Sequence, residues 1–331
     1  MNIGIVCYPT FGGSGVVATE LGIELARLGN QVHFISYSQP VRLDLYENNI
    51  YYHEVVVTNY PLFDYSPYEL MLTSKLVSVA KNENLDVLHV HYAIPHASAA
   101  YMAKKILEYE GVHIPIICTL HGTDITLLGK DASFEPVITF AINNSDAVTA
   151  VSQSLANDTF AHFKVNRKLN VIPNFINLTR YEHLKPNGLR ARFAHESEPL
   201  IMHVSNFRNV KRVDDVVRVF AGVREKLKCQ LLLIGDGPER SNVEEMCRSL
   251  GMCEDIHFFG KSKNIEQFLV NGDLFILPSE TESFGLAALE AMAAGMPVIS
   301  SNTGGLPEVN EHGFSGYLCD VGDTERMTDY R

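Results

Sequence analysis

The chain has 331 residues, of which 46% are apolar, and it is therefore long enough to form two globular domains with separate hydrophobic cores. Lys and Arg number 27 against 39 Asp and Glu, a net charge of −12 that argues against binding nucleic acid or an anionic membrane through bulk charge. No apolar run approaches the length of a membrane span and no signal peptide opens the chain, so we expect a cytoplasmic protein without membrane insertion.

Cysteine usage gives no sign of a disulfide framework or a zinc site. The six residues are scattered along the chain without a Cys-x-x-Cys pair. We therefore predict free, buried thiols at Cys7, Cys118, Cys229, Cys247, Cys253 and Cys319.

The first half of the chain alternates short apolar runs with helical stretches, as in a doubly wound α/β domain. Amphipathic periodicity predicts helices over residues 16–28 and 70–82. The turn Gly12-Gly13-Ser14-Gly15 before the first helix lacks the full GxGxxG spacing, which argues against dinucleotide binding. Strands are predicted at residues 3–7, 31–36, 50–57, 86–91, 115–120 and 145–152.

Polar residues stand where several of these strands end, and ligands bind beyond the carboxyl ends of such strands. Tyr92 follows the strand at 86–91, and Thr119 and His121 end the strand at 115–120. A histidine before a glycine turn is placed to meet a ligand, with a purely structural histidine as the alternative. Arg42, in a loop, is either a solvated cation or a ligand for an anion.

A further histidine group, His89, His91 and His96, raises the question of a metal site. Alternate strand residues face the same side, which suits His-x-His coordination, but no clustered acid completes the ligand set. We therefore predict no metal there.

A polar, charged stretch at residues 183–199, with Pro186 and Gly188, is typical of a domain boundary. We predict an N-terminal domain over 1–183 and a C-terminal domain over 184–331. The second domain repeats the α/β pattern, with predicted strands at residues 200–205, 230–234, 256–261, 273–277, 297–301 and 316–318.

A cluster of basic residues follows the strand at 200–205. Arg208, Lys211 and Arg212 are three cations within five residues, at a strand-to-helix turn. Such a cluster suits phosphate binding. A solvated basic turn is the alternative interpretation.

The stretch LPSETESFGLAALEAMAAG, residues 277–295, is the most informative part of the sequence. We predict that Phe284, Gly285 and Leu286 form the first turn of a helix whose free N–H groups bind phosphate, with Gly285 allowing close approach. Glu290 would accept from ribose hydroxyls and Glu282 from a transferred sugar. The alternative is a buried helix with a helix-favouring acid near each end.

These motifs resemble a known enzyme family. Glu-x7-Glu inside ExFGLxxxE, followed by EAMAxGxPVI and GGLPEV, closely resembles the signature of the retaining family 4 glycosyltransferases. The resemblance implies an α/β GT-B fold, with two doubly wound Rossmann-like domains facing across a cleft. The first would bind mainly the acceptor and the second the nucleotide-sugar donor. Relatives continue for a few dozen residues beyond Arg331, so we expect this chain to lack their C-terminal helices.

The resemblance also implies roles for individual residues. Asn206 stands where the family pattern GRxxxxK has its arginine, and Arg208 is the candidate to replace it. Catalytic roles are implied for His121, Lys211 and Glu282. Donor contacts are implied for Gly15, Asn206, Arg208, Lys211, Gly260, Lys261, Glu282, Phe284, Gly285, Leu286 and Glu290.

The segments GGSGVVATELG, HVHYAIPHA, TLHGTDIT and VSNFRxVKR together resemble a subgroup of this family that transfers N-acetylglucosamine from UDP-GlcNAc to L-malate, the first step of bacillithiol biosynthesis. For such an acceptor, the first domain offers Gly13, Ser14, Arg42, Tyr92 and Thr119. No Asp-x-Asp triplet occurs, so we expect no metal and no other cofactor. Another donor and acceptor, or a non-catalytic nucleotide-sugar-binding protein, remain alternatives, and homo-oligomerisation is left open.

Overall fold

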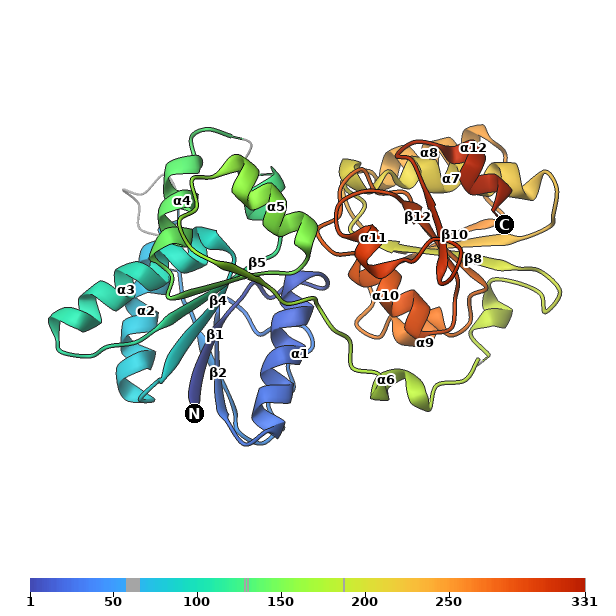
Figure 1. Cartoon of the computed structure of the whole chain (residues 1–331). Helices are drawn as coiled ribbons and strands as arrows, with labels where there is room; N and C mark the ends of the chain where they lie inside the picture. The colour runs from blue at the N-terminus through green and yellow to red at the C-terminus, as the bar shows by residue number, and fades with distance from the viewer. Residues whose placement is uncertain (58–65, 128, 130, 187, 331) are drawn as a thin grey trace. The chain divides into compact units, whose positions relative to one another are not determined.

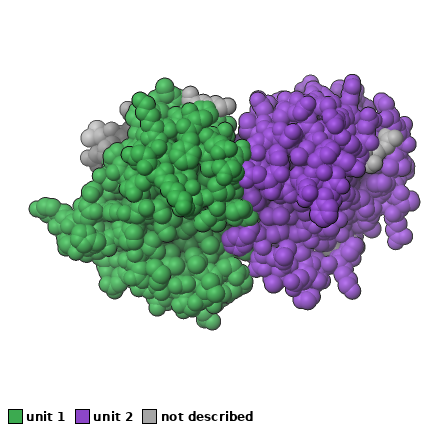
Figure 2. Space-filling model, viewed as in Figure 1, with its two compact units in different colours: residues 1–174 green, residues 175–331 purple. Residues whose placement is uncertain are grey.

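The computed structural model describes residues 1–57, 66–127, 129, 131–186 and 188–330. It divides into two units, Met1–Asn174 and Phe175–Arg331, which Figure 2 shows in separate colours. The boundary predicted at residue 183 lies just past helix α6 (Thr179–Glu182), inside the second unit. The polar composition after residue 183 marks an exposed segment, whereas the division between the packed units falls earlier.

Unit 1 is built on a seven-stranded parallel sheet in the order β3-β2-β1-β4-β5-β6-β7. The order reverses between β1 and β4, and such a switch point is where doubly wound sheets bind ligands. The strands are β1 Asn2–Val6, β2 Gln31–Ser36, β3 Ile50–Glu54, β4 Val87–His91, β5 Ile116–Leu120, β6 Ala147–Ala150 and β7 Leu169–Val171.

Helices cover both faces of this sheet, with α1 on one face and α2 and α3 on the other (Figure 1). Helix α1 begins at Ser14 instead of Val16, so Gly15 lies inside its first turn. Ser152 caps α5, accepting a hydrogen bond from the N–H of Leu155. The elements are α1 Ser14–Arg27, α2 Tyr68–Asn82, α3 Ser98–Tyr109, α4 Glu135–Asn144 and α5 Gln153–His162, with short π-helical turns η1 Ala93–Ala97 and η2 Thr123–Leu127.

Unit 2 repeats the arrangement on a six-stranded parallel sheet in the order β10-β9-β8-β11-β12-β13. Its switch point lies between β8 and β11. The strands are β8 Leu200–Ser205, β9 Gln230–Gly235, β10 Ile256–Gly260, β11 Leu274–Leu277, β12 Val298–Ser301 and β13 Gly316–Cys319. The helices are η4 Arg190–Arg192, η5 Asn209–Lys211, α7 Val213–Arg224, α8 Arg240–Ser249, α9 Glu266–Leu269, α10 Leu286–Ala293, α11 Leu306–Val309 and α12 Thr324–Asp329.

The predicted start of the helix after β11 was wrong. Helix α10 begins at Leu286, and Gly285 precedes it as a cap with φ of 100°, in the left-handed region. A Cβ on Gly285 would also lie 2.6 Å from Cδ2 of Leu306. Backbone conformation and packing therefore require glycine here, with or without a ligand.

Two apolar clusters cover the two faces of the unit 2 sheet. One joins the sheet to α7 and α8 and includes Phe220; the other joins it to α9 and α10 and includes Phe275. All six cysteines are free, as predicted, and all but Cys253 are buried; the predicted burial is wrong for Cys253, which is exposed. Within the described residues, no helix combines the length and apolarity needed to cross a membrane.

Candidate active site

The switch point of unit 1 brings two hydroxyl groups together. Ser14 starts the helix that follows β1, and Tyr92 directly follows β4. The Ser14 Oγ and the Tyr92 hydroxyl share a hydrogen bond of 2.7 Å. Tyr92 has φ of 90°, an uncommon conformation for a bulky residue that turns the chain sharply at the strand end. The sequence placed both residues among the acceptor contacts, and the structure places them in contact with each other.

Histidines from the neighbouring strand ends form a second layer of polar contacts. His91 Nδ1 and His121 Nε2 share a hydrogen bond of 2.7 Å, and His89 Nε2 lies 2.7 Å from the hydroxyl of Thr119. Burial lowers the pKa of His121 to about 3 and that of His89 to about 4. These imidazoles are therefore neutral at physiological pH, and they can offer hydrogen bonds but no positive charge.

A carboxylate that sequence reasoning missed ties these loops together. Asp124 accepts hydrogen bonds from the N–H groups of Ala93 at 2.7 Å and Gly122 at 3.2 Å, and so joins the segments after β4 and β5. Burial raises the pKa of Asp124 to about 6, although the backbone donors oppose that rise. The signal was present in the motif TLHGTDIT, where Asp124 closely follows His121.

Arg42 is neither solvated nor an isolated cation. Its Nη1 lies 3.4 Å from Oε1 of Glu20, and the two side chains are only 10% and 3% exposed. Glu20 belongs to α1, so this ion pair joins the loop after β2 to that helix. The interpretation of Arg42 as a solvated residue is therefore wrong, and its proposed anion contact would have to share the guanidinium with Glu20.

Gly13, another predicted acceptor residue, is exposed at the start of α1, with φ of 59°.

The switch point of unit 2 carries an ion pair. Lys211 ends η5, after β8, and its Nζ lies 2.5 Å from Oε1 of Glu282, in the loop after β11. Ser279 donates a hydrogen bond of 3.1 Å to the same carboxylate oxygen. The N–H of Glu280 donates to the carbonyl of Val210 at 2.8 Å, which fixes the two loops to each other. The structure thus brings together two of the three residues predicted to be catalytic.

The GGLPEV segment packs directly against the Glu282 loop. The N–H of Gly305 donates to the carbonyl of Glu282 at 2.9 Å, and a Cβ on Gly304 would lie 1.9 Å from that carbonyl oxygen. Glu290 lies on α10 with its side chain buried. The spaced motifs of the sequence therefore come together as one packed loop-and-helix unit.

The remaining predicted donor residues occupy different environments. The Phe284 ring is buried, so only its backbone remains for a ligand, and Leu286 is partly buried at the start of α10. Asn206 and Arg208 are exposed after β8, and the Arg208 guanidinium has no ion-pair partner in the part of the chain that the structure describes.

Three predicted donor residues lie away from the switch point of unit 2: Gly260 and Lys261 at the edge of its sheet, and Gly15 in unit 1. Gly260, with φ of 88°, ends the edge strand β10, which β9 separates from β8, and Lys261 follows it. Gly15 packs within unit 1, where a Cβ would lie 2.5 Å from the carbonyl oxygen of Tyr8. The fold therefore requires glycine at position 15 without any ligand.

Comparison with known proteins agrees with this architecture. Residues 11–180 match the family described as Glycosyltransferase Family 4, and residues 188–330 match Glycosyl transferases group 1. The N-acetyl-alpha-D-glucosaminyl L-malate synthase of Bacillus anthracis is 49% identical over 99% of this chain and 86% of its own length. The 2-deoxystreptamine N-acetyl-D-glucosaminyltransferase of Niallia circulans is 25% identical over 77% of this chain and 68% of its own.

Solved structures show the same fold at lower sequence identity. The Anabaena protein HepE, crystallised with UDP and glucose, superposes with a TM-score of 0.82 at 19% identity, covering 99% of this chain and 88% of that one. Such a similarity confirms the predicted GT-B fold of two Rossmann-like units. With matching family models across both units and a relative 49% identical along nearly its whole length, this chain belongs to the family 4 glycosyltransferases.

Proposed function

We propose that this glycosyltransferase moves N-acetylglucosamine from UDP-GlcNAc to the hydroxyl of L-malate, with retention at the anomeric carbon and without a metal ion. The observation that carries the proposal is the 49% identity, over 99% of the chain, to a protein named for GlcNAc and L-malate. A UDP-linked donor is further supported by the similar fold of a protein crystallised with UDP and glucose.

Lys211 and the start of α10 would stabilise the negative charge of the departing diphosphate. A lysine and the first N–H groups of a helix both favour an anion, and such preorganised groups lower the barrier where charge develops. Lys211 is paired with Glu282 at 2.5 Å, so an incoming phosphate would compete with this carboxylate for the ammonium group. Glu282 would then be released to accept a hydrogen bond from a hydroxyl of the transferred sugar.

Retention would follow from reaction on one face of the sugar. The malate hydroxyl oxygen would bond to the anomeric carbon as the bond to the diphosphate oxygen breaks on the same face. The hydroxyl proton would pass to that phosphate oxygen. Because burial lowers the pKa of His121 to about 3, this imidazole is a weak base, and we assign it a positioning contact with the donor sugar instead.

Unit 1 would supply the acceptor contacts. The paired hydroxyls of Ser14 and Tyr92 and the N–H groups around Gly13 could donate to the malate carboxylates. Thr119 is already bonded to His89 at 2.7 Å and to the Thr149 hydroxyl at 2.8 Å, so it would act mainly by holding His89 in place. Arg42 would contribute while still paired with Glu20.

Mass spectrometry of the products tests the proposal directly. The protein would be incubated with UDP-GlcNAc and a panel of L-malate, lactate and a neutral sugar, with UDP-glucose as the control donor. We expect an N-acetylhexosamine adduct of malate, and little product from lactate, which lacks one carboxylate. Equal transfer to lactate or to the neutral sugar would contradict malate as the acceptor. UDP binding without transfer or hydrolysis would favour a non-catalytic binding protein.

A further inference from the structure

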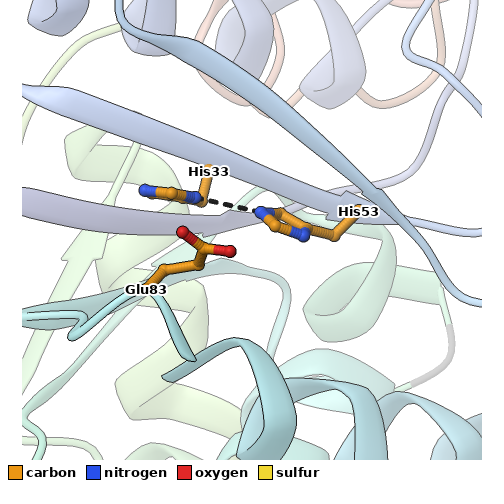
Figure 3. A group of neighbouring side chains, drawn as sticks. All are labelled: His33, His53 and Glu83. Carbon is orange, nitrogen blue, oxygen red and sulfur yellow. Dashed lines mark hydrogen bonds between the residues drawn. The ribbon is translucent and has the colours of Figure 1, made fainter. Parts of the chain in front are cut away.

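A group of possible metal ligands lies in unit 1, away from the residues discussed so far. His33 on β2, His53 on β3 and Glu83, just after α2, each direct one ligand atom to a common point, and these three atoms lie within 4.8 Å of one another (Figure 3). His33 Nδ1 and His53 Nε2 share a hydrogen bond of 2.9 Å, which an ion held by both nitrogens would replace. It is the only such group among the residues that the structure describes.

Strand pairing explains why the two imidazoles meet. In the parallel register of β2 and β3, His33 is paired with Tyr51 and Ile35 with His53. Tyr51 and His53 alternate along β3 and so face the same side as His33. The His33 ring stacks on Tyr51 at 4.7 Å and on His53 at 5.2 Å between ring centroids. These contacts fix both rings before any ion arrives.

Glu83 reaches the same point from another direction. It follows the last residue of α2, and its carbonyl accepts a hydrogen bond of 3.0 Å from the side chain of Asn2, the first residue of β1. The backbone of Glu83 therefore lies near the amino-terminal end of β1, and its carboxylate reaches His33 in the middle of β2 and His53 near the end of β3. Ser14 and Tyr92 follow the carboxyl ends of β1 and β4, at the switch point.

The electrostatics of the group suit a cation. Each imidazole offers a lone pair on nitrogen and Glu83 a carboxylate oxygen, so the three ligand atoms bring one negative charge to a divalent ion. His33 is 1% exposed, and its Nε2 is buried without a hydrogen-bond partner among the described residues. No hydrogen bond at Nε2 therefore competes to turn this ring away from the site.

We propose that His33, His53 and Glu83 bind a divalent transition-metal ion of the Zn²⁺ class. Two imidazoles and one carboxylate are a ligand set that zinc accepts, and water can occupy the fourth position. The ion would cross-link β2, the edge strand β3 and the end of α2. Because its ligands lie on β2, β3 and the end of α2 and not at the β1–β4 switch point, this is a stabilising site and not a part of sugar transfer.

Calorimetric titration of metal-free protein with ZnCl₂ tests the site. We expect one equivalent of Zn²⁺ to bind. His53→Gln and Glu83→Gln should each weaken that binding by at least roughly 10- to 100-fold, because loss of even an outer-shell partner of a metal ligand has an effect of that size. His162→Gln, which alters an exposed histidine at the end of α5, is the matched control and should bind as the unmodified protein does.

Two further measurements distinguish loss of the metal site from poor folding of a variant. Co²⁺ should give the strong visible absorption of a four-coordinate site in the unmodified protein and in His162→Gln, and lose it in Glu83→Gln. Zn²⁺ should raise the unfolding temperature of the same two proteins but not that of Glu83→Gln. Equal Zn²⁺ affinity in all the variants, or no binding at micromolar concentrations, would overturn the proposal.

Discussion

The two units place different chemistry at the same point of the same topology. In unit 1 the strand order reverses between β1 and β4, and the residues that meet across the switch point are the neutral hydroxyls of Ser14 and Tyr92, 2.7 Å apart. In unit 2 it reverses between β8 and β11, and the residues that meet are charged, Lys211 and Glu282, 2.5 Å apart. The sheet supplies the position, and the loop residues decide what binds there.

The groups behind each pair extend this difference. Neutral buried histidines surround the unit 1 pair, and burial lowers the pKa of His91 well below its ordinary value. The loop of the unit 2 pair instead leads into α10, where Glu290 adds a second carboxylate. A neutral hydrogen-bonding surface and a charged one suit different parts of the proposed reaction, acceptor positioning and diphosphate binding respectively.

Acidification should lower the stability of unit 1 much more than that of unit 2. Burial lowers the pKa of His89 and His96 to about 4 and that of His121 to about 3, so their stability contribution is complete above pH 6.5 and is lost as pH falls toward those values. Asp124, with its pKa raised to about 6, works in the opposite direction and offsets part of the loss. Buried His91 adds to the loss, so at about 1.4 kcal/mol per pKa unit, unit 1 should lose several kcal/mol of stability between pH 7 and pH 5.

Hydrogen exchange measured peptide by peptide, corrected for intrinsic rates, reports the two units separately. Unit 2 contributes His203, whose pKa burial lowers to about 4, so it should lose less protection over the same range. Equal loss in both units would mean that the histidine layer does not govern the acid response.

Lys211→Ala should produce the largest change in ligand binding. Its charge-assisted hydrogen bond to a diphosphate should contribute about 1.5–3 kcal/mol, so UDP affinity should fall by roughly 10- to 150-fold. Calorimetry with UDP measures the effect, and Lys226→Ala, a change to an exposed lysine of the same unit, is the matched control. An unchanged affinity in Lys211→Ala would remove the ion pair from the donor site.

Glu290→Ala tests whether the charged donor-binding residues of unit 2 include the carboxylate on α10. If Glu290 accepts from both ribose hydroxyls, the variant should bind UDP several-fold more weakly, while binding of 2′,3′-dideoxy-UDP changes little. Both ligands can be titrated against the same protein preparation. A similar loss for the two nucleotides would assign this buried carboxylate to the fold instead of to the ribose.

The sequence predicted the elements best where local pattern alone decides them. The strands β2 and β8 have the predicted bounds because each is an apolar run bounded by polar residues. The start of α10 was misplaced because Gly285 adopts a left-handed conformation against Leu306, a residue that lies beyond β12. Helix propensity carries no information about such a distant contact.

The same limit applies to the side chains of the candidate sites. The motifs identified Lys211 and Glu282, which the structure pairs, but nothing near Arg42 in sequence indicated that Glu20 neutralises it. His33 and His53 lie on separate strands, and only the β2–β3 register brings them together. Pairings of this kind depend on tertiary structure, whereas strand ends and glycine turns can be recognised locally.

Tyr92→Phe tests whether the neutral hydroxyl pair of unit 1 binds the acceptor. Removing the phenol hydroxyl breaks its 2.7 Å bond to Ser14 and one potential donor to malate, a net loss of about 0.5–1.5 kcal/mol. The KM for malate should therefore rise by roughly 2- to 13-fold while UDP affinity holds. Ser14→Ala should behave alike, and Arg42→Ala should also raise that KM but destabilise unit 1 by removing the ion pair with the buried Glu20. A KM unchanged in Tyr92→Phe would move the acceptor elsewhere.

The smallest expected effect is that of chelation on the transfer rate. The chain has no Asp-x-Asp triplet to hold a cation against a diphosphate, whereas Lys211 and the N–H groups that begin α10 can take that role. Excess EDTA should therefore leave the initial rate with UDP-GlcNAc nearly unchanged. If His33, His53 and Glu83 bind zinc, EDTA should lower the unfolding temperature of zinc-loaded protein without slowing transfer, because that site involves β2, β3 and the end of α2 and not the switch point of Ser14 and Tyr92. Activity abolished by EDTA and restored by Mg²⁺ or Mn²⁺ would show instead that a metal, and not Lys211 alone, carries the diphosphate charge.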